Sequence, residues 1–453
     1  ADLPGVTAAA DFVAWYNGHP DFAGLAPDLT HERVVVLGNG NVALDVARIL
    51  TADPATFEGT DMTEEALAAL RDSRVREVVI LARRGPGHAA FTAPELVGLA
   101  RAVPVVVDPA SNWPLFAEKA RDLIANQHVA VVFGCWTSVS RKSVLPVFEE
   151  LNGLLFYPVQ YEGEEMSPNV FYTGAAPNQQ AIPAVEYLLS EDGGGAKRFF
   201  LLGTDYVYPR TTNKILRAFL HAKGIQDKDI EEVYTPFGYS DYQTIVANIK
   251  KFSAGGKTAV VSTINGDSNV PFYKELANQG LKATDVPVVA FSVGEEELRG
   301  IDTKPLVGNL AAWNYFESVD NPTNKQFVAD YRAYAKAHKL PNADTVVTND
   351  PMEATWVGLH MWAQAVTKAG STDVDKVRDA MAGQTFKAPS GFTLTMDATN
   401  HHLHKPVMIG EIESNGQFNV VWQTEEPVRA QPWSPWIAGN DKKPDHPVKT
   451  VSN

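Results

Sequence analysis

The chain has 453 residues and a formal net charge of −15 at pH 7. That charge argues against a nucleic-acid partner, whose phosphates it would repel, and no apolar run reaches the ~18 residues that a membrane span needs. A hydrophobic content of 45% and a charged content of 21% fit a globular protein large enough for about two or three domains.

The first part of the chain predicts a strand, a glycine turn and a helix. The sequence is RVVVLGNGNVALDVARIL (33–50), in which Gly38, Gly40 and Ala43 supply the G-x-G-x-x-A form of the dinucleotide fingerprint. The glycines permit a tight turn and a close backbone approach. A pyrophosphate would therefore lie at the helix start, near Asn41.

A second strand is predicted at 77–81. It is followed by Arg83 and Arg84, which can pair with a 2′-phosphate and so favour NADP over NAD. The segment resembles the NADP domain of adrenodoxin-reductase-like ferredoxin–NADP reductases in TAAADFVAWYNGHPDF, GNGNVALDVARIL and RRGPGHAAFTAPEL. The resemblance and the fingerprint together give these candidate NADP contacts: Gly38, Asn39, Gly40, Asn41, Val42, Arg83, Arg84 and Glu95. The flavin motif that such reductases also need is not found, so we expect no redox chemistry from this segment alone.

A polar cluster follows the next predicted strand. Helix 112–126 leads to strand 129–133, and the residues after Gly134 are Cys135, Trp136, Thr137 and Ser138. A helix (139–150) and another strand (154–157) come next. Ligands of parallel sheets bind outside the carboxyl ends of the strands, and the free N–H groups of a helix start suit a carbonyl oxygen or an anion. Aromatic neighbours predict that the single cysteine is a buried, unreactive thiol.

Strand, polar loop and helix then recur along the chain. The repeats are KRFFLLGTDYVYPR, EEVYTPFGYSDYQTIVANIKKF, TAVVSTINGDSNVPFYKELANQG and PVVAFSVGEEELRGI. They predict parallel sheets with helices on both faces. The HHLH stretch (401–404) is interpreted as a polar loop, because an extended segment points alternate rings to opposite faces. No metal site and no catalytic residue is predicted.

Three stretches carry a second resemblance: GCWTSVSRKSVLPVFEE, LLFYPVQYEGEEMSPNVFYTGAAPNQQ and GTDYVYPR. They resemble the substrate-binding component of urea and short-chain amide ABC transporters, a type I periplasmic binding protein, over about 105–436. The resemblance implies an α/β fold of two Rossmann-like lobes with parallel sheets and a hinge, preceded here by the Rossmann-like N-terminal segment. The expected divisions are 1–104 (NADP-binding-like), 105–236 (first lobe), 237–390 (second lobe with hinge crossings) and 391–453 (small β extension and tail). We expect a chimera-like chain, in which the N-terminal segment stands in place of the first βαβ unit of the binding protein; a natural two-domain chain is the alternative.

The resemblance also implies the function. The protein would capture urea or a short-chain amide in the cleft between the lobes and present it to an ABC permease, with no cofactor required and NADP a candidate at the N-terminal segment. Two alternatives remain open: an NADP-binding oxidoreductase fragment, and an amide-sensing regulator. A periplasmic location is expected, or a cytoplasmic one if the N-terminus ADLPGV is native. The sequence does not separate urea from formamide or acetamide.

An amide pocket needs acceptors for N–H groups, a donor for the carbonyl and flat aromatic walls. The strand ends supply the candidates Trp136, Thr137, Ser138, Tyr157, Tyr206, Thr263, Ser292 and Glu295. By resemblance, Ser138, Tyr157 and Tyr206 match positions that touch the ligand, whereas Thr263, Ser292 and Glu295 rest on strand-end location. Tyr206 and Tyr208 alternate along a segment predicted to be extended, so only Tyr206 is expected to face the cleft.

Overall fold

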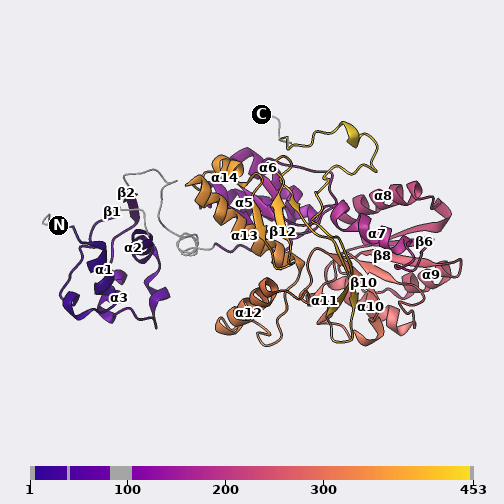
Figure 1. Cartoon of the computed structure of the whole chain (residues 1–453), viewed down its shortest axis with the longest axis horizontal. Helices are drawn as coiled ribbons and strands as arrows, with labels where there is room; N and C mark the ends of the chain where they lie inside the picture. Colours follow the sequence, from indigo (N-terminus) through magenta and orange to yellow (C-terminus); the bar gives the residue numbers. More distant parts are fainter. Residues whose placement is uncertain (1–5, 38–40, 82–104, 449–453) are drawn as a thin grey trace. The chain divides into compact units, whose positions relative to one another are not determined.

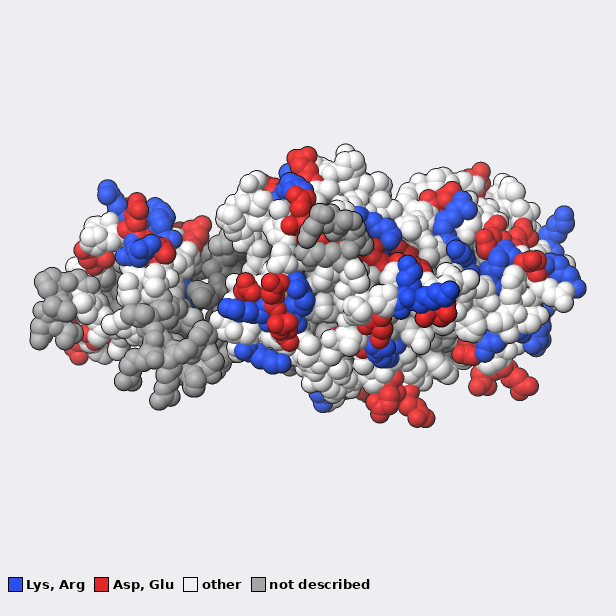
Figure 2. Space-filling model, turned by 90° about the horizontal axis from the view of Figure 1, so that it is seen from above, with Lys and Arg blue, Asp and Glu red and all other residues white. Residues whose placement is uncertain are grey.

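A computed structural model of the chain describes residues 6–37, 41–81 and 105–448. The chain divides into two compact units, one of residues 1–108 with 362–380 and the other of residues 109–361 with 381–453 (Figure 1). Among the described helices, none is both long and apolar enough to cross a membrane. Lys and Arg are interspersed with Asp and Glu over the face that Figure 2 presents, without a continuous basic area.

The N-terminal part of the first unit has a two-stranded parallel sheet, in which β1 (Arg33–Leu37) pairs with β2 (Glu77–Leu81). Its helices are α1 (Ala9–Tyr16), α2 (Asn41–Thr51) and α3 (Glu64–Arg71), with short 3₁₀ turns at Pro20–Phe22 and Pro54–Phe57. Buried side chains such as Phe12, Trp15, Ile49 and Leu67 form a core of its own. The predicted strands and the helix between them are confirmed, while the predicted glycine turn lies outside the described residues.

The second unit contains a first lobe built on a small parallel sheet. Its strands are β3 (Val132–Phe133), β4 (Leu155–Tyr157) and β5 (Val170–Tyr172), covered by α5 (Trp113–Ala125) and α6 (Ser138–Leu151). Helix α5 begins where the Asn112 side chain accepts a hydrogen bond from the Leu115 amide, and α6 ends at Asn152, which has a left-handed φ of 50°. Phe148, Leu155 and Tyr172 join in one buried core.

The second lobe is a seven-stranded sheet in the order β15-β14-β10-β9-β8-β6-β7. Five of its strands are parallel: β6 (Arg198–Thr204), β7 (Ile230–Thr235), β8 (Thr258–Thr263), β9 (Val288–Ala290) and β10 (Leu310–Trp313). An antiparallel edge is added by β14 (Met408–Ile412) and β15 (Phe418–Gln423). The helices that cover this sheet are α7 (Ala181–Leu189), α8 (Val207–Ala222), α9 (Gln243–Ser253) and α10 (Asn269–Asn278), and the short α11 (Glu295–Leu298) packs with them.

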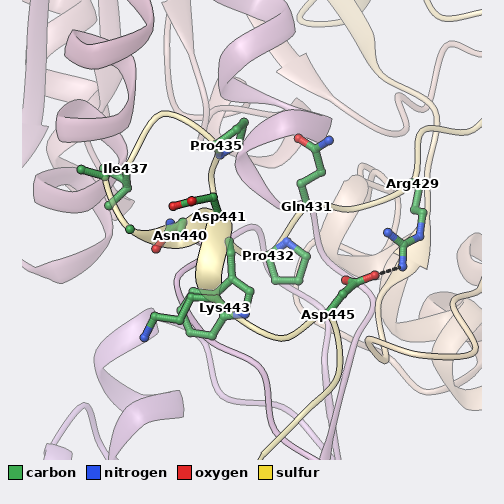
Figure 3. Close-up of a pocket in the computed structure, with 12 residues that line it drawn as sticks. Arg429, Gln431, Pro432, Pro435, Ile437, Asn440, Asp441, Lys443 and Asp445 are labelled. Carbon is green, nitrogen blue, oxygen red and sulfur yellow. Dashed lines mark hydrogen bonds and ion pairs between the residues drawn. The ribbon is translucent and has the colours of Figure 1, made fainter.

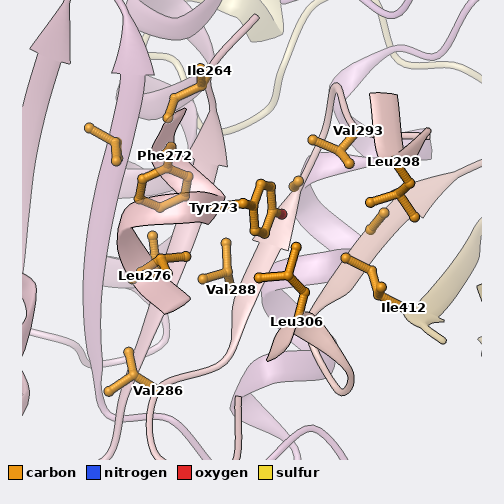
Figure 4. Packing of buried hydrophobic residues seen from close by; sticks show 14 of the residues in the cluster. Ile264, Phe272, Tyr273, Leu276, Val286, Val288, Val293, Leu298, Leu306 and Ile412 are labelled. Atoms are coloured by element: carbon orange, nitrogen blue, oxygen red, sulfur yellow. The ribbon is translucent and has the colours of Figure 1, made fainter. Parts of the chain in front are cut away.

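Both faces of this sheet are buried, as expected for parallel strands between helix layers. Phe200 and Leu202 of β6 pack with α9 and α10, whereas Phe199 and Leu201 pack with α7 and α8. Figure 1 shows the two helix pairs on opposite sides of the sheet, and Figure 4 shows the first core from close by. The near-continuous apolar runs of the sequence therefore reflect strands that are covered on both sides.

Three connections pass between the lobes, at residues 173–180, 314–321 and 405–407. Asn314 ties them together, because its Nδ2 donates to the carbonyl oxygens of Gln179 (2.9 Å) and Pro406 (2.6 Å). The remaining elements are α12 (Pro322–Ala337), α13 (Asp350–Ala369), α14 (Val374–Met381) and a small sheet of β11 (Thr385–Lys387), β12 (Thr393–Met396) and β13 (Leu403–His404). A bridge from Tyr172 to His402 places β13 beside the first lobe.

The expected lobe boundary at residue 236 is wrong. Strands β6 and β7, within residues 198–235, pair with β8 in the sheet of the second lobe, so the first lobe's own sheet ends at β5. The segment 391–453 also does more than form a small extension, since β14 and β15 complete the large sheet. The pattern of apolar residues predicts strands well, but which sheet a strand joins depends on contacts distant in sequence.

Candidate ligand-binding site

The carboxyl ends of strands from both lobes face each other where the lobes meet, a junction that is called the cleft from here on. Gln160, which follows β4, donates from Nε2 to the Phe291 carbonyl oxygen and to Ser292 Oγ, both at 2.8 Å, just beyond β9. Trp136, which follows β3, lies against Gly266 of the second lobe: a Cβ on Gly266 would be 3.7 Å from the indole ring. The two lobes are therefore in contact across the cleft.

On the second lobe, a short chain of hydrogen bonds lines the cleft. Tyr206 donates from its hydroxyl to Asn265 Oδ1 (2.9 Å), and Asn265 Nδ2 donates to Ser292 Oγ (2.9 Å). Ser292 thus accepts hydrogen bonds from both lobes, because Gln160 reaches it from the first.

On the first lobe, a buried ionic cluster lies beside Tyr157. Arg141 is fully buried and donates from Nε to Glu165 (2.7 Å) and from Nη2 to Glu162 (3.1 Å), while Ser138 donates from Oγ to Glu162. The guanidinium carbon lies 4.8 Å from the centre of the Tyr157 ring. Burial favours the neutral form of Glu165, but the charges of Arg141 and Lys142 lower its pKa to about 2.

Three buried polar atoms in this cleft have no partner in hydrogen-bond geometry: the hydroxyls of Tyr157 and Tyr208, and Oε1 of Gln160. Ser138 lies near the Tyr157 hydroxyl, and Gln160 and Ser292 lie near that of Tyr208, close enough to oppose the rise in the two pKa values. Burial raises the pKa of both tyrosines, so each retains its phenolic proton. The negative charge of Glu162 adds to the rise in both pKa values. Each such buried group left without a partner costs ~1–3 kcal/mol, so the cleft favours a ligand that supplies the partners.

Tyr208 lies at the cleft because the segment that contains it is helical and not extended. The expectation that only Tyr206 faces the cleft assumed an extended segment, but α8 begins at Val207, and the Tyr206 and Tyr208 rings lie 6.2 Å apart. Polar groups of Gln160 and Ser292 lie near enough to Tyr208 to oppose the rise in its pKa that burial causes. Helical geometry thus allows both tyrosines to approach the same groups, and that expectation is wrong.

The structure brings five of the predicted residues together at the cleft: Trp136, Ser138, Tyr157, Tyr206 and Ser292. The side chains of the other three make local contacts. Thr137 caps α6 by accepting from the Ser140 amide (3.3 Å), and Thr263 donates to the Leu202 carbonyl (3.4 Å) within the sheet. Glu295 accepts from the Glu317 amide (2.7 Å), and burial raises the pKa of Glu295 to about 8.

Three residues of the cleft were not considered in the sequence analysis, Arg141, Gln160 and Glu162, and a fourth, Tyr208, was set aside there. The stretch YPVQYEGEE, directly after β4, contains two of them. An amide and a run of carboxylates at the carboxyl end of a buried strand is a signal that could have been used. The pairing of Glu162 with Arg141 joins residues 21 apart, and nothing in the local sequence predicts it.

The candidate NADP contacts are mostly beyond what the structure describes. Gly38, Asn39, Gly40, Arg83, Arg84 and Glu95 lie outside the described residues. Asn41 begins α2, and Val42, in its first turn, is 51% exposed. The strand and the helix that would frame a pyrophosphate are therefore present, while the contacts themselves stay predictions.

The histidines at 401–404 do not form the polar loop that was expected. His402 is buried, its ring lies 4.3 Å from the parallel ring of Tyr172, and its Nε2 is hydrogen-bonded to the Tyr161 hydroxyl. Burial lowers the pKa of His402 to about 3, so the imidazole is neutral. Within the described part of the chain, no group of three or more His, Cys, Asp or Glu side chains is arranged to hold a metal.

A separate surface hollow of about 400 Å³ lies in the C-terminal segment, lined by Trp433, Pro435 and Lys443 among others (Figure 3). Arg429 at its edge is already paired, since it binds both Asp445 (2.6 Å) and Asp397 (2.6 Å), and Lys443 lies over the Trp433 ring. Unlike the cleft, it contains none of the unpartnered buried atoms found in the described residues. We therefore assign the ligand site to the cleft.

Two α/β lobes, three connections and a cleft at the strand ends define a type I periplasmic binding protein. A family model described as periplasmic binding protein domain matches residues 97–438, and the chain belongs to this family. Solved structures agree in fold: a solute-binding protein from Rhodopseudomonas palustris in complex with 4-hydroxybenzoate is 19% identical, with a TM-score of 0.59 over 87% of this chain and 97% of that one. An amino acid ABC transporter substrate-binding protein from Pseudomonas fluorescens is 16% identical, with a TM-score of 0.61 over 90% and 100%.

The N-terminal residues match a different group of proteins. A probable ferredoxin/ferredoxin–NADP reductase of Mycobacterium bovis is 61% identical over 110 residues, which are 24% of this chain and 19% of that protein. The NADPH-ferredoxin reductase FprA of Mycobacterium tuberculosis is 50% identical over 137 residues, or 29% of this chain and 30% of that one. The chain thus spans less than a third of the length of these relatives. The predicted resemblances to a type I periplasmic binding protein and to ferredoxin–NADP reductases are confirmed, while the specificity for urea or an amide stays a prediction.

Proposed function

We propose that the protein is the solute-binding component of an ABC transporter, and that it captures urea or a short-chain amide in its interlobe cleft for delivery to a permease. The observation that carries this proposal is the set of three unpartnered buried atoms on Tyr157, Gln160 and Tyr208. The family's setting favours a periplasmic location.

A small amide satisfies these atoms. The tyrosine hydroxyls can donate to the carbonyl oxygen of the ligand, and Gln160 Oε1 can accept from one of its N–H groups. The rings of Tyr157, Tyr206 and Trp136 supply flat walls for a planar ligand. A ligand that lacks the N–H groups leaves Gln160 Oε1 unsatisfied, at a cost of ~1–3 kcal/mol.

The charge balance of the cleft favours a neutral ligand over a carboxylate. Arg141 is paired with both Glu162 and Glu165, and Lys142 is paired with Glu165 at 2.7 Å. Among the described residues of the cleft, these two cations are therefore already neutralised. 4-Hydroxybenzoate and amino acids, the solutes for which the neighbouring structures are named, would bring a carboxylate with no free cation among the described cleft residues to receive it.

Calorimetric titration with urea, formamide and acetamide tests the proposal, with benzoate and an amino acid as contrasting solutes. We expect saturable binding of at least one neutral amide, weakened about 5- to 150-fold by Tyr157→Phe or Tyr208→Phe, since each removes one hydroxyl worth ~1–3 kcal/mol. Tyr334→Phe is the matched control, because that ring is 55% exposed on α12. Tight binding of benzoate, or of no amide at all, contradicts the proposal.

A second candidate function belongs to the N-terminal segment, favoured by its 61% identity to a ferredoxin–NADP reductase. We infer that it binds NADP through Gly40, Asn41, Arg83 and Arg84, as a dinucleotide site without redox chemistry of its own. NADP should then stabilise this part of the chain against heat, which scanning calorimetry measures.

A further inference from the structure

The side chain of Gln160 joins the two lobes at the cleft. Its side chain is 4% exposed, it follows β4 of the first lobe, and its amide nitrogen donates to Phe291 O and Ser292 Oγ of the second. One side chain thus connects the two halves of the cleft at the level of the candidate site.

The orientation of this amide is fixed by chemistry. A backbone carbonyl oxygen can only accept hydrogen bonds, so the group that faces Phe291 O must be the NH₂ of Gln160 and not its oxygen. Oε1 must therefore point to the other side, where it is buried and has no partner. The only kind of group that satisfies it is a hydrogen-bond donor within the closed cleft.

We propose that Gln160 couples recognition of the ligand to closure of the lobes: its NH₂ holds the second lobe while its Oε1 accepts an N–H of the ligand. This inference rests on the proposed function and deepens it, since it makes an N–H donor the feature that the cleft selects. An empty closed cleft buries Oε1 together with the hydroxyls of Tyr157 and Tyr208 unpaired, so closure without a ligand is disfavoured.

Gln180 provides an internal comparison. Its Nε2 also donates to Phe291 O (3.2 Å), and to Ala312 O (2.6 Å), but its oxygen is not among the unpartnered atoms. Gln180 lies in the connection between the lobes. Gln180→Leu therefore removes a bond to the same carbonyl without removing an acceptor for the ligand.

The test uses acetamide and acetone, which share a shape and a carbonyl but differ in the NH₂ group. Calorimetry, by displacement for weak binding, gives the ratio of their affinities. We expect the full-length protein to prefer acetamide at least tenfold, Gln160→Leu to reduce this ratio at least fivefold, and Gln180→Leu to leave it within twofold. A general loss of stability does not change such a ratio.

A second variant distinguishes the role of the Gln160 NH₂ group from that of Oε1. Gln160→Glu keeps an acceptor for the ligand but places an oxygen against Phe291 O, so the decrease in radius of gyration on adding acetamide, measured by small-angle scattering, should be lost. An unchanged acetamide-to-acetone ratio in Gln160→Leu overturns the inference and leaves the proposed function standing. Failure of the unmodified protein to bind urea, formamide or acetamide overturns both.

Discussion

The buried guanidinium of Arg141 organises the first-lobe side of the cleft. It is held by two carboxylates and lies against the rings of Tyr157 and Tyr161, at 4.8 and 4.7 Å from their centres. Charges out of contact with water are tolerated only when their partners are complete. The cluster therefore fixes the positions of Ser138 and Tyr157 more firmly than the loop sequence alone would.

Removing this cation should be costly. Arg141→Met leaves Glu162 and Glu165 buried without their main partner, and we expect a loss of ~3–5 kcal/mol in the free energy of unfolding. Guanidinium chloride denaturation measures it, since urea is a candidate ligand. The control is Arg121→Met, whose pair with Glu150 is about half exposed and should cost less than ~1 kcal/mol. Equal losses of unfolding free energy in the two variants would show that the buried ion pairs of Arg141 contribute no more to stability than an exposed pair.

Which residues reach the cleft could be predicted in part from the sequence. Strand-end position suffices for Trp136, Tyr157 and Ser292, because parallel strands bring their carboxyl ends to one edge. Strand-end position is not sufficient for Thr263, whose hydroxyl donates to a carbonyl within the sheet. Nor does it predict the roles of Arg141 and Glu162, because these two residues pair with each other although they are far apart in the sequence. The types of residue along the sequence do not predict which distant side chains will pair.

Among the elements, the third connection and the start of α13 bring buried charges together. Lys405 is fully buried, donates to Thr173 O (2.9 Å) and lies 3.8 Å from Asp350. Glu353 is buried nearby, and Asp350 also accepts a hydrogen bond from the Asn314 amide (2.9 Å). Two carboxyl groups thus share one ammonium group, so one carboxyl is best accommodated in its protonated form.

This arrangement predicts a pH dependence of stability. Burial raises the pKa of Glu353 to about 7, with Asp350 adding to the rise and Lys405 opposing it. Because the folded-state pKa lies above the unfolded value of 4.5, the stabilisation is complete below that value and is lost as pH rises through about 7. The total is on the order of 3 kcal/mol. Melting temperatures between pH 4.5 and 8 measure the decline.

Glu353→Gln isolates this contribution. The amide cannot ionise, so the variant should lose less stability than the unmodified protein as the pH rises. Glu295, whose pKa burial raises to about 8, contributes a decline of the same sign in both proteins, and the difference between the two curves removes it. Parallel curves for the two proteins would contradict a titrating role for Glu353.

At the scale of the whole molecule, the sequence predicts the type of each element better than its partners. The α/β class, the two resemblances and the strands follow from apolar periodicity and long motifs. The membership of β6 and β7 in the second lobe does not, because each sheet is assembled from strands that lie far apart in the chain. The connection after β5 leads the chain into the second lobe, and it is held there by hydrogen bonds from Gln180 to Ala312 O and from Gln179 to Leu403 O of β13.

Separate cores for the two units predict separate thermal behaviour of the full-length chain. The N-terminal elements bury their own apolar cluster, and the two lobes bury others. We expect scanning calorimetry to resolve two transitions. NADP should raise the temperature of one and urea or an amide that of the other, and each ligand should stabilise its unit by ~2.7 kcal/mol at a concentration 100 times Kd.

NAD should have less effect than NADP, because Arg83 and Arg84 favour the 2′-phosphate. Arg84→Ala should abolish the NADP response and leave the amide response intact. A single transition raised by both ligands would mean that the two units unfold as one and that binding at either site stabilises the whole chain.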